Sequence, residues 1–255
     1  DWEKISYCLK KYTADYSDSS YTDTNTTDYQ NMLKSVYING GFWIGRYEAG
    51  YEIDESNDEK VRYYGTYYNT EHPITQKVVI KKNVYPYNWV RREQAQTLAE
   101  GMNYTGVTSS LIYGVQWDLV LKYIETKNPA QKSKLISDST TIGNYNNSLW
   151  NITNVNVKYS TNSGEIFTAC SYEKKSSANV LLTTGADKSF SLMNIYDIAG
   201  NVREWTKEFY NTNYPCVNRG GGYSLSGSDN PAEYHDNNSI SYSSSYLGFR
   251  IGLWK

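Results

Sequence analysis

The sequence predicts an α+β domain with two early helices and many short antiparallel strands. Two amphipathic helix patterns lie in the first half of the chain, whereas short runs of β-branched and aromatic residues, separated by glycines, fill the last third. Helices grouped before strands are typical of α+β proteins and argue against βαβ alternation. The 255 residues fit one large domain or two small ones, and the 39% of apolar residues can form a core.

Two segments, residues 90–102 and 108–128, have the apolar spacing i, i+3, i+4, i+7 of amphipathic helices. The first segment contains Ala95, Leu98, Ala99 and Met102 at this spacing. The second contains Trp117, Val120, Leu121 and Ile124. We expect Gly101 to end the first helix and Ser109 or Ser110 to cap the start of the second.

The rest of the chain has weaker patterns. Residues 1–35 are polar, and we expect an exposed lead-in with a short helix near Asp28–Ser35, followed by one domain over residues 36–255. Residues 37–52 predict a strand with a bulge, because β-forming residues surround three glycines. Residues 128–191 are rich in Asn, Ser and Thr and predict loops with short strands.

Charge and composition exclude several classes of protein. A net charge of −2 with mixed signs argues against a nucleic-acid partner, which usually requires a basic face. No run of about eighteen apolar residues occurs, so we expect no membrane span in this chain. The chain opens at Asp1 without a signal-peptide pattern. We therefore expect an upstream targeting or anchoring segment to be missing from this chain, and the resemblance described at the end of this section implies an extracellular or surface-displayed protein, on a cell surface or a phage tail.

Three cysteines, Cys8, Cys170 and Cys216, lack the spacing of a metal site. In an extracellular protein one pair would form a disulfide, whereas the alternative is three free thiols.

Three segments of the last third share a pattern of glycines, β-forming residues and aromatics. They read "YDIAGNVREW" from Tyr196, "RGGGY" from Arg219 and "GFR" from Gly248. These motifs, in this order, resemble those of the formylglycine-generating-enzyme (sulfatase-modifying factor) family, which has a C-type-lectin-like fold. The stretch "GGFWIGRYEAG" resembles the opening strand of that family, so the resemblance covers Tyr37 to Lys255.

The motifs also predict core residues. We expect Trp205, Phe249 and Trp254 to be buried, and we expect Arg219 and Arg250 to bind backbone carbonyls rather than a substrate.

The resemblance does not carry over the family's redox chemistry. The formylglycine-generating members bind copper through two cysteines, and those positions fall near Leu225 and Asn230 in this chain. The iron-dependent members need several histidines, whereas this chain has only His72 and His235. We therefore expect a protein that is not an enzyme and requires no cofactor.

One metal remains implied by the resemblance. In the family, the segment that matches Asp197–Glu204 can hold calcium, here through the carboxylates of Asp197 and Glu204 and the carbonyls of Gly200 and Val202. The alternative is that Asp197 caps a turn and Glu204 pairs with Arg203 or Arg219.

The segment Tyr223–Tyr246 has an unusual composition. Eighteen of its 24 residues are Ser, Tyr, Asn, Asp or His, and it contains no Lys, Gln, Met or Trp. Free replacement of the two adenines in an Asn codon yields Tyr, Ser, Asp and His but never Lys, Gln, Met, Trp or Glu. Glu233 alone departs from this pattern.

This pattern resembles the variable proteins of diversity-generating retroelements, which carry such a region at the end of the same fold. The resemblance implies a non-catalytic ligand-binding protein with a variable region at about residues 220–250, displaying side chains to an unknown protein or glycan on a cell or host surface. We expect Tyr223, Tyr234, His235, Tyr242 and Tyr246 to be the anchors. The other predicted contacts are Ser224, Ser226, Ser228, Asp229, Asn230, Asp236, Asn238, Ser239, Ser241, Ser243 and Ser245. The alternatives are an ordinary lectin-like adhesin or pilin-tip subunit and, disfavoured by the missing ligands, a metal-dependent oxidase.

Overall fold

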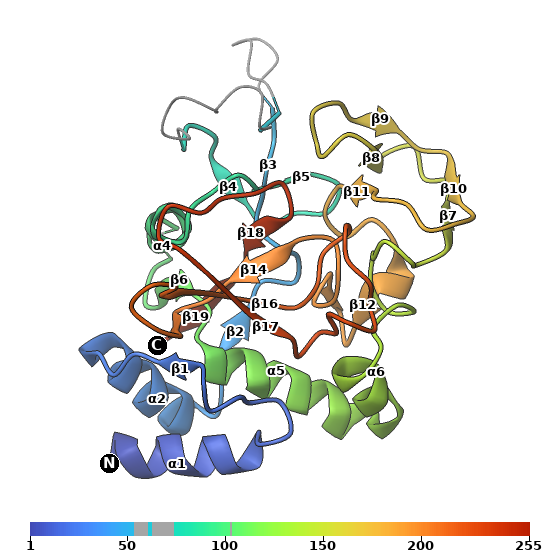
Figure 1. The fold of residues 1–255 in the computed structure, drawn as a ribbon. Helices are drawn as coiled ribbons and strands as arrows, with labels where there is room; N and C mark the ends of the chain where they lie inside the picture. Colours follow the sequence, from blue (N-terminus) through green and yellow to red (C-terminus); the bar gives the residue numbers. More distant parts are fainter. Residues whose placement is uncertain (54–60, 63–73, 103) are drawn as a thin grey trace.

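The computed structural model describes residues 1–53, 61–62, 74–102 and 104–255. In this part of the chain the α-helices are α1 (Trp2–Tyr12), α2 (Thr27–Asn39), α4 (Arg92–Glu100), α5 (Gly114–Lys127) and α6 (Lys132–Ile136). Two short 3₁₀ helices are η2 (Pro129–Gln131) and η3 (Lys188–Phe190). The predicted α+β architecture is confirmed, and Figure 1 shows α1, α2 and α5 gathered on one side of the strands.

The strands are short and numerous, as predicted. They are β1 (Thr22–Asp23), β2 (Trp43–Ile44), β3 (Gly50–Tyr51), β4 (Val78–Val79), β5 (Tyr85–Pro86), β6 (Thr108–Leu111), β7 (Trp150–Ile152), β8 (Lys158–Ser160), β9 (Thr168–Ala169), β10 (Tyr172–Lys174), β11 (Leu181–Leu182), β12 (Ser191–Leu192), β13 (Ile195–Tyr196), β14 (Arg203–Trp205), β15 (Glu208–Phe209), β16 (Cys216–Arg219), β17 (His235–Asn238), β18 (Leu247–Phe249) and β19 (Ile251–Trp254). The segment of residues 128–191 contains β7 to β11, which form small sheets over their own apolar cluster.

Both predicted helices form, but the second one begins later than expected. Ser109 and Ser110 belong to strand β6, so neither caps α5. Instead, the Asp23 carboxylate accepts hydrogen bonds from the backbone N–H groups of Gly114 (2.7 Å) and Val115 (2.9 Å). A residue far away in the sequence thus satisfies the free N–H groups at the start of α5.

The expectation of an exposed lead-in over residues 1–35 is wrong. The helix predicted near Asp28–Ser35 forms as α2, but α1 precedes it and packs on both α2 and α5. Tyr16 and Leu33 are fully buried, and β1 pairs with β15. The apolar positions are too few and too scattered to be recognised locally, yet Tyr29, Met32 and Leu33 of α2 are buried where the helices meet the domain, and Trp2, Ile5 and Leu9 of α1 are partly buried.

The central sheet places the variable region at its edge. Its strand order is β17–β16–β14–β18, with β14 and β18 parallel and the other pairs antiparallel. A second sheet, β2–β19–β6, lies beside it. The predicted core residues are all buried, Trp205 and Phe249 in one apolar cluster and Trp254 in another that includes residues of α2. Because β17 lies at the edge of the sheet, its outward side chains border solvent while β16 fixes its backbone.

Glycine is required at Gly200, where the motif segment that begins at Tyr196 passes close to the backbone of Asn144. Gly200 has φ of +76°, and a Cβ there would lie 2.5 Å from the carbonyl oxygen of Asn144. Asn144 forms a parallel bridge with Gly200, so a side chain at this position would push the two backbones apart.

Substitutions in α2 can test whether residues 1–35 pack on the domain. Leu33→Ala removes a buried side chain, and we expect it to lower the free energy of unfolding by about 2–5 kcal/mol. Tyr37 lies on the same helix and is 73% exposed. Tyr37→Ala should therefore change the free energy by less than about 0.5 kcal/mol. Equal, small effects in urea titrations of the two variants would show that residues 1–35 do not pack on the domain.

Candidate ligand-binding site

Residues 223–246, which make up most of the predicted variable region, are held to the domain at both ends and do not form a free tail. At its start, Tyr223 N–H donates to the carbonyl of Asn201 (2.8 Å), and at its end Arg203 N–H donates to the carbonyl of Tyr246 (2.8 Å). Between these points, β17 pairs with β16 along its whole length. Main-chain hydrogen bonds therefore hold the path of the segment and do not depend on which side chains it carries.

Most of the predicted contact residues reach solvent. Fully exposed are Ser228, Asp229 and Ser241. Partly exposed are Ser224, Ser226, Tyr234, Asp236, Asn238, Ser239, Tyr242, Ser243 and Tyr246. These residues combine phenol rings with short hydroxyl, amide and carboxylate groups, which suits adaptable contact with a macromolecular surface.

Three predicted contact residues are buried, and the prediction for them is corrected. The Tyr223 hydroxyl forms a hydrogen bond with the Ser245 hydroxyl (2.8 Å) beneath the surface, and Asn230 Oδ1 accepts one from Arg203 (2.6 Å). All three side chains are buried within the domain. They support the surface and do not face a ligand.

His235 is also corrected, because its side chain is only 6% exposed. Its ring stacks on Tyr21 at a centroid distance of 4.8 Å, and its Nε2 lies 3.5 Å from the Glu208 carboxylate. Burial and the nearby charge of Arg219 lower the pKa of His235, although Glu208 opposes this effect. Alternation along β17 turns His235 and Asn237 toward Tyr21, whereas Asp236 faces Arg203.

The structure adds Arg203, which the sequence did not indicate as part of the site. Its guanidinium, on β14 beneath the variable segment, forms an ion pair with Asp236 and lies under two rings. The Arg203 Cζ atom lies 5.4 Å from the ring centroid of Tyr234 and 6.0 Å from that of Tyr246. A fixed cation therefore positions two of the predicted aromatic anchors. The hydroxyls of Tyr242 and Tyr246 form a hydrogen bond with each other. Both rings are partly buried against the apolar core.

The residues at the positions of the family's copper ligands can be placed in this structure. Leu225 and Asn230 occupy the positions of the copper ligands in the resemblance, and Asn230 is bound to Arg203. Cys8, Cys170 and Cys216 are all free thiols, so the open question of a disulfide is resolved in favour of three thiols in this structure. Among the described residues, no three His, Cys, Asp or Glu side chains lie close enough together to hold a metal ion, and His72 lies outside those residues.

The calcium ligands implied by the resemblance do not fit a cation. Both oxygens of Glu204 accept hydrogen bonds from Arg250, at 2.9 Å and 2.6 Å, and Asp197 accepts one from Gly185 N–H (2.6 Å). Glu204 therefore pairs with Arg250, rather than with Arg203 or Arg219.

Burial also acts on the neighbouring acids of this cluster. It raises the pKa of Asp197 to about 7. Burial, followed by the charges of Asp197 and Glu204, raises the pKa of Glu48 well above its usual range. The charged forms of Asp197 and Glu48 are therefore disfavoured, and Arg250 is the cation that lies beside Glu204.

We expect calcium to be dispensable for this fold, which thermal unfolding can test. We expect the same melting temperature in millimolar calcium and in EDTA, because Arg250 already occupies both oxygens of Glu204. A rise of several degrees with calcium that disappears in Glu204→Gln would show that the carboxylate binds the ion instead.

Both the sequence and the structure of this chain are similar to those of known proteins. The chain matches the family model described as sulfatase-modifying factor enzyme 1-like domain over residues 20–252. Among solved structures it is similar to CarF, with 14% identity, a TM-score of 0.49 and coverage of 84% of this chain and 86% of that one. It is also similar to PvdO from Pseudomonas aeruginosa, with 14% identity, a TM-score of 0.46 and coverage of 84% of this chain and 80% of that one. Treponema denticola variable protein 1 has 15% identity and a TM-score of 0.37, with coverage of 66% of this chain and 70% of that one. No curated protein matches the chain at a significant level.

The family match begins upstream of Tyr37, the point from which the motifs suggested a resemblance. This agrees with the packing of the N-terminal segment on the domain. The match and the α+β architecture confirm the predicted C-type-lectin-like fold of the formylglycine-generating-enzyme type. This chain belongs to the sulfatase-modifying factor enzyme 1-like domain family.

Proposed function

We propose that this chain is a non-catalytic ligand-binding protein whose C-terminal region is diversified by a retroelement to vary its partner. The observation that carries the proposal is the separation of roles within residues 223–246. Main-chain hydrogen bonds and buried side chains hold the segment, whereas the exposed positions carry Tyr, Ser, Asn and Asp. A surface built in this way can change its contacts without changing its fold.

The chemistry of the surface supports binding rather than catalysis. Phenol rings give large contact areas at low entropic cost, and the short polar groups around them supply hydrogen bonds. The cysteine pair and the histidine set that the family's oxidases use are not present at the matching positions. The partner in this proposal is a protein or glycan on a cell or host surface, and the chain acts outside the cell.

No helix in the described parts of the chain combines the length and the apolar character needed to cross a bilayer.

The gene offers the most direct test of diversification. We expect a reverse-transcriptase gene nearby, together with a near-copy of the 3′ end of this gene whose mismatches fall at adenines. Genome sequencing around the locus checks this. If neither is present, the region is an ordinary polar surface, and the proposal retreats to a lectin-like adhesin or pilin-tip subunit.

Tolerance of the exposed positions is a second test, made on the protein itself. Ser228→Tyr, Asp229→Tyr and Ser241→Tyr change exposed side chains, so we expect each to alter the free energy of unfolding by less than about 0.5 kcal/mol. The matched control is Tyr223→Ser within the same segment, which removes a buried ring and should cost about 3 kcal/mol or more. Large losses at the three exposed positions in urea titrations would mean that the surface is structural.

A further inference from the structure

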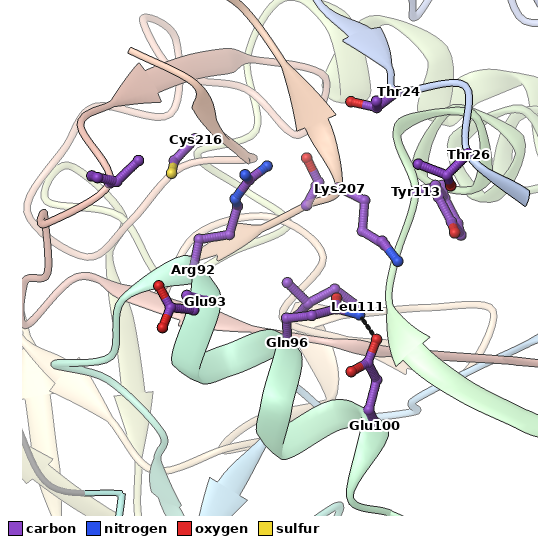
Figure 2. Close-up of a pocket in the computed structure, with 12 residues that line it drawn as sticks. Thr24, Thr26, Arg92, Glu93, Gln96, Glu100, Leu111, Tyr113, Lys207 and Cys216 are labelled. Atoms are coloured by element: carbon purple, nitrogen blue, oxygen red, sulfur yellow. Dashed lines mark hydrogen bonds between the residues drawn. The ribbon is translucent and has the colours of Figure 1, made fainter. Parts of the chain in front are cut away.

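Two cavities of the domain differ in how far their charged groups are already satisfied. Figure 2 shows the first, which lies along helix α4, with Gln96 bonded to Glu100. Arg92 of this cavity donates to the backbone carbonyl of Glu208 (3.0 Å), and the negative charge of Glu100 acts on Lys207. These charged groups satisfy one another within the domain.

The second cavity has a volume of about 400 Å³ and is rich in acidic groups. The loop between α1 and β1, the start of α5 and strand β15 form its walls. Four carboxylates line it, those of Asp18, Asp23, Asp118 and Glu208. Among the described lining residues, Lys10 is the one cation.

Two of these carboxylates are satisfied within the domain. Asp23 accepts hydrogen bonds from two backbone N–H groups at the start of α5, and the charge of Lys10 acts on it. Glu208 accepts hydrogen bonds from Arg219 (3.1 Å) and from the Thr206 hydroxyl (2.7 Å). These two acids hold the walls of the cavity and leave the other two to meet a ligand.

Asp118, on α5, has one oxygen without a partner. Its side chain is 8% exposed, and its Oδ1 accepts a hydrogen bond from Arg219 (2.7 Å). No residue that the structure describes donates to its Oδ2. Burial raises the pKa of Asp118 to about 7, although the charge of Arg219, which Asp118 shares with Glu208, opposes this. A cationic donor from outside would therefore stabilise the charged form of Asp118.

Asp18 is an exposed acid that lines the same cavity. Its Oδ1 accepts the backbone N–H of Ser20 (2.8 Å), and this hydrogen bond lowers the pKa of Asp18. Asp18 is therefore charged at neutral pH. A charged acid at the surface and a mostly buried one behind it form a pair of acceptors for a cationic group that enters from solvent.

The surroundings indicate which ligand fits these acids. Tyr21 also lines the cavity, but its ring is already stacked on Tyr210 (5.0 Å between centroids) and on His235 (4.8 Å), so it is not open for a sugar to stack on. A divalent metal ion needs several oxygen ligands, and in the described parts of the chain no three acidic, His or Cys side chains lie close enough to hold one. An ammonium or guanidinium group needs only a few acceptors.

The cavity also borders the edge strand that carries the predicted contact residues. The Tyr21 hydroxyl accepts a hydrogen bond from Asn237 Nδ2 (3.1 Å) on β17. Glu208 Oε1 lies 3.5 Å from Nε2 of His235 on the same strand. A protein seated on the variable surface and reaching over β17 would therefore meet the cavity.

We propose that this cavity binds a Lys or Arg side chain of a protein partner, with Asp18 and Asp118 accepting hydrogen bonds from its cationic group. The inference rests on the proposed function, because the partner is the one that sits on the variable surface. Both acids lie outside residues 223–246, so they provide a constant contact beside the varying ones.

A random peptide library displayed on phage and panned on the full chain tests this inference. We expect the selected peptides to carry Lys or Arg, and Asp18→Asn to weaken their binding about tenfold, as when one charge-assisted hydrogen bond is lost. The amide keeps an oxygen that accepts Ser20 N–H, so this variant retains the fold. Replacing the peptide's cationic residue by norleucine should weaken binding similarly, and the two changes together should cost little more than either alone.

The chain offers a matched control for this substitution. Asp187 accepts the backbone N–H of Ser189 at 2.8 Å, as Asp18 does with Ser20, but it does not line the cavity. Asp187→Asn should therefore leave binding unchanged. Asp118→Asn keeps an oxygen for Arg219 and should also weaken binding, and Asp18→Asn decides alone if that variant does not fold.

The outcomes separate this inference from the proposed function. Selected peptides without Lys or Arg, or equal binding to the parent chain and to Asp18→Asn, would remove the cationic site. Binding that is lost in Tyr242→Ser but unchanged in Asp18→Asn would remove the cavity and leave the ligand-display function standing. Binding lost in Asp18→Asn but unchanged in Tyr242→Ser would instead count against the variable surface and leave the cavity as the binding site.

Discussion

The buried ion pair between Arg250 and Glu204 joins the first and the last of the three motif segments to the opening segment of the domain. Besides binding both oxygens of Glu204, Arg250 donates to the carbonyls of Gly45 and Tyr196, each at 2.8 Å. The pair thus joins the opening strands, the turn before β14 and the last two strands. Removing one member would leave a buried charge without a partner, which is strongly destabilising. The prediction that Arg250 binds backbone carbonyls is confirmed, but its carboxylate partner was not foreseen.

A second buried cluster fixes the sheet from the other side. Arg219 on β16 forms ion pairs with Asp118 (2.7 Å) and Glu208 (3.1 Å), and it also donates to the carbonyl of Tyr16 (3.2 Å). Burial raises the pKa of Glu208, but the charges of Arg219 and His235 outweigh it and lower that pKa to about 2. Helix α5, the N-terminal segment and the central sheet therefore meet at one arginine.

This division fits the proposed function, in which a rigid fold carries a changeable surface. The fixed cation Arg203 lies beneath the rings of Tyr234 and Tyr246. It belongs to the scaffold, whereas the exposed Ser, Tyr and Asp side chains above it belong to the segment proposed to vary. Charges that require an ordered environment are thus placed in the constant part, and short or rigid groups that adapt to a partner are placed in the varying part.

The sequence by itself determined the fold class, the existence of helices α4 and α5, and the core residues Trp205 and Phe249, because these follow from local periodicity and from motifs, whereas the start of α5 at Gly114 was not predicted. It also determined the composition of the variable segment. Only the tertiary structure decided that Tyr223, Asn230, Ser245 and His235 turn inward and that the polar first 35 residues pack on the domain. The physical reason is that burial depends on which distant segments meet, as Tyr21 meets His235, and neither composition nor local spacing encodes that meeting.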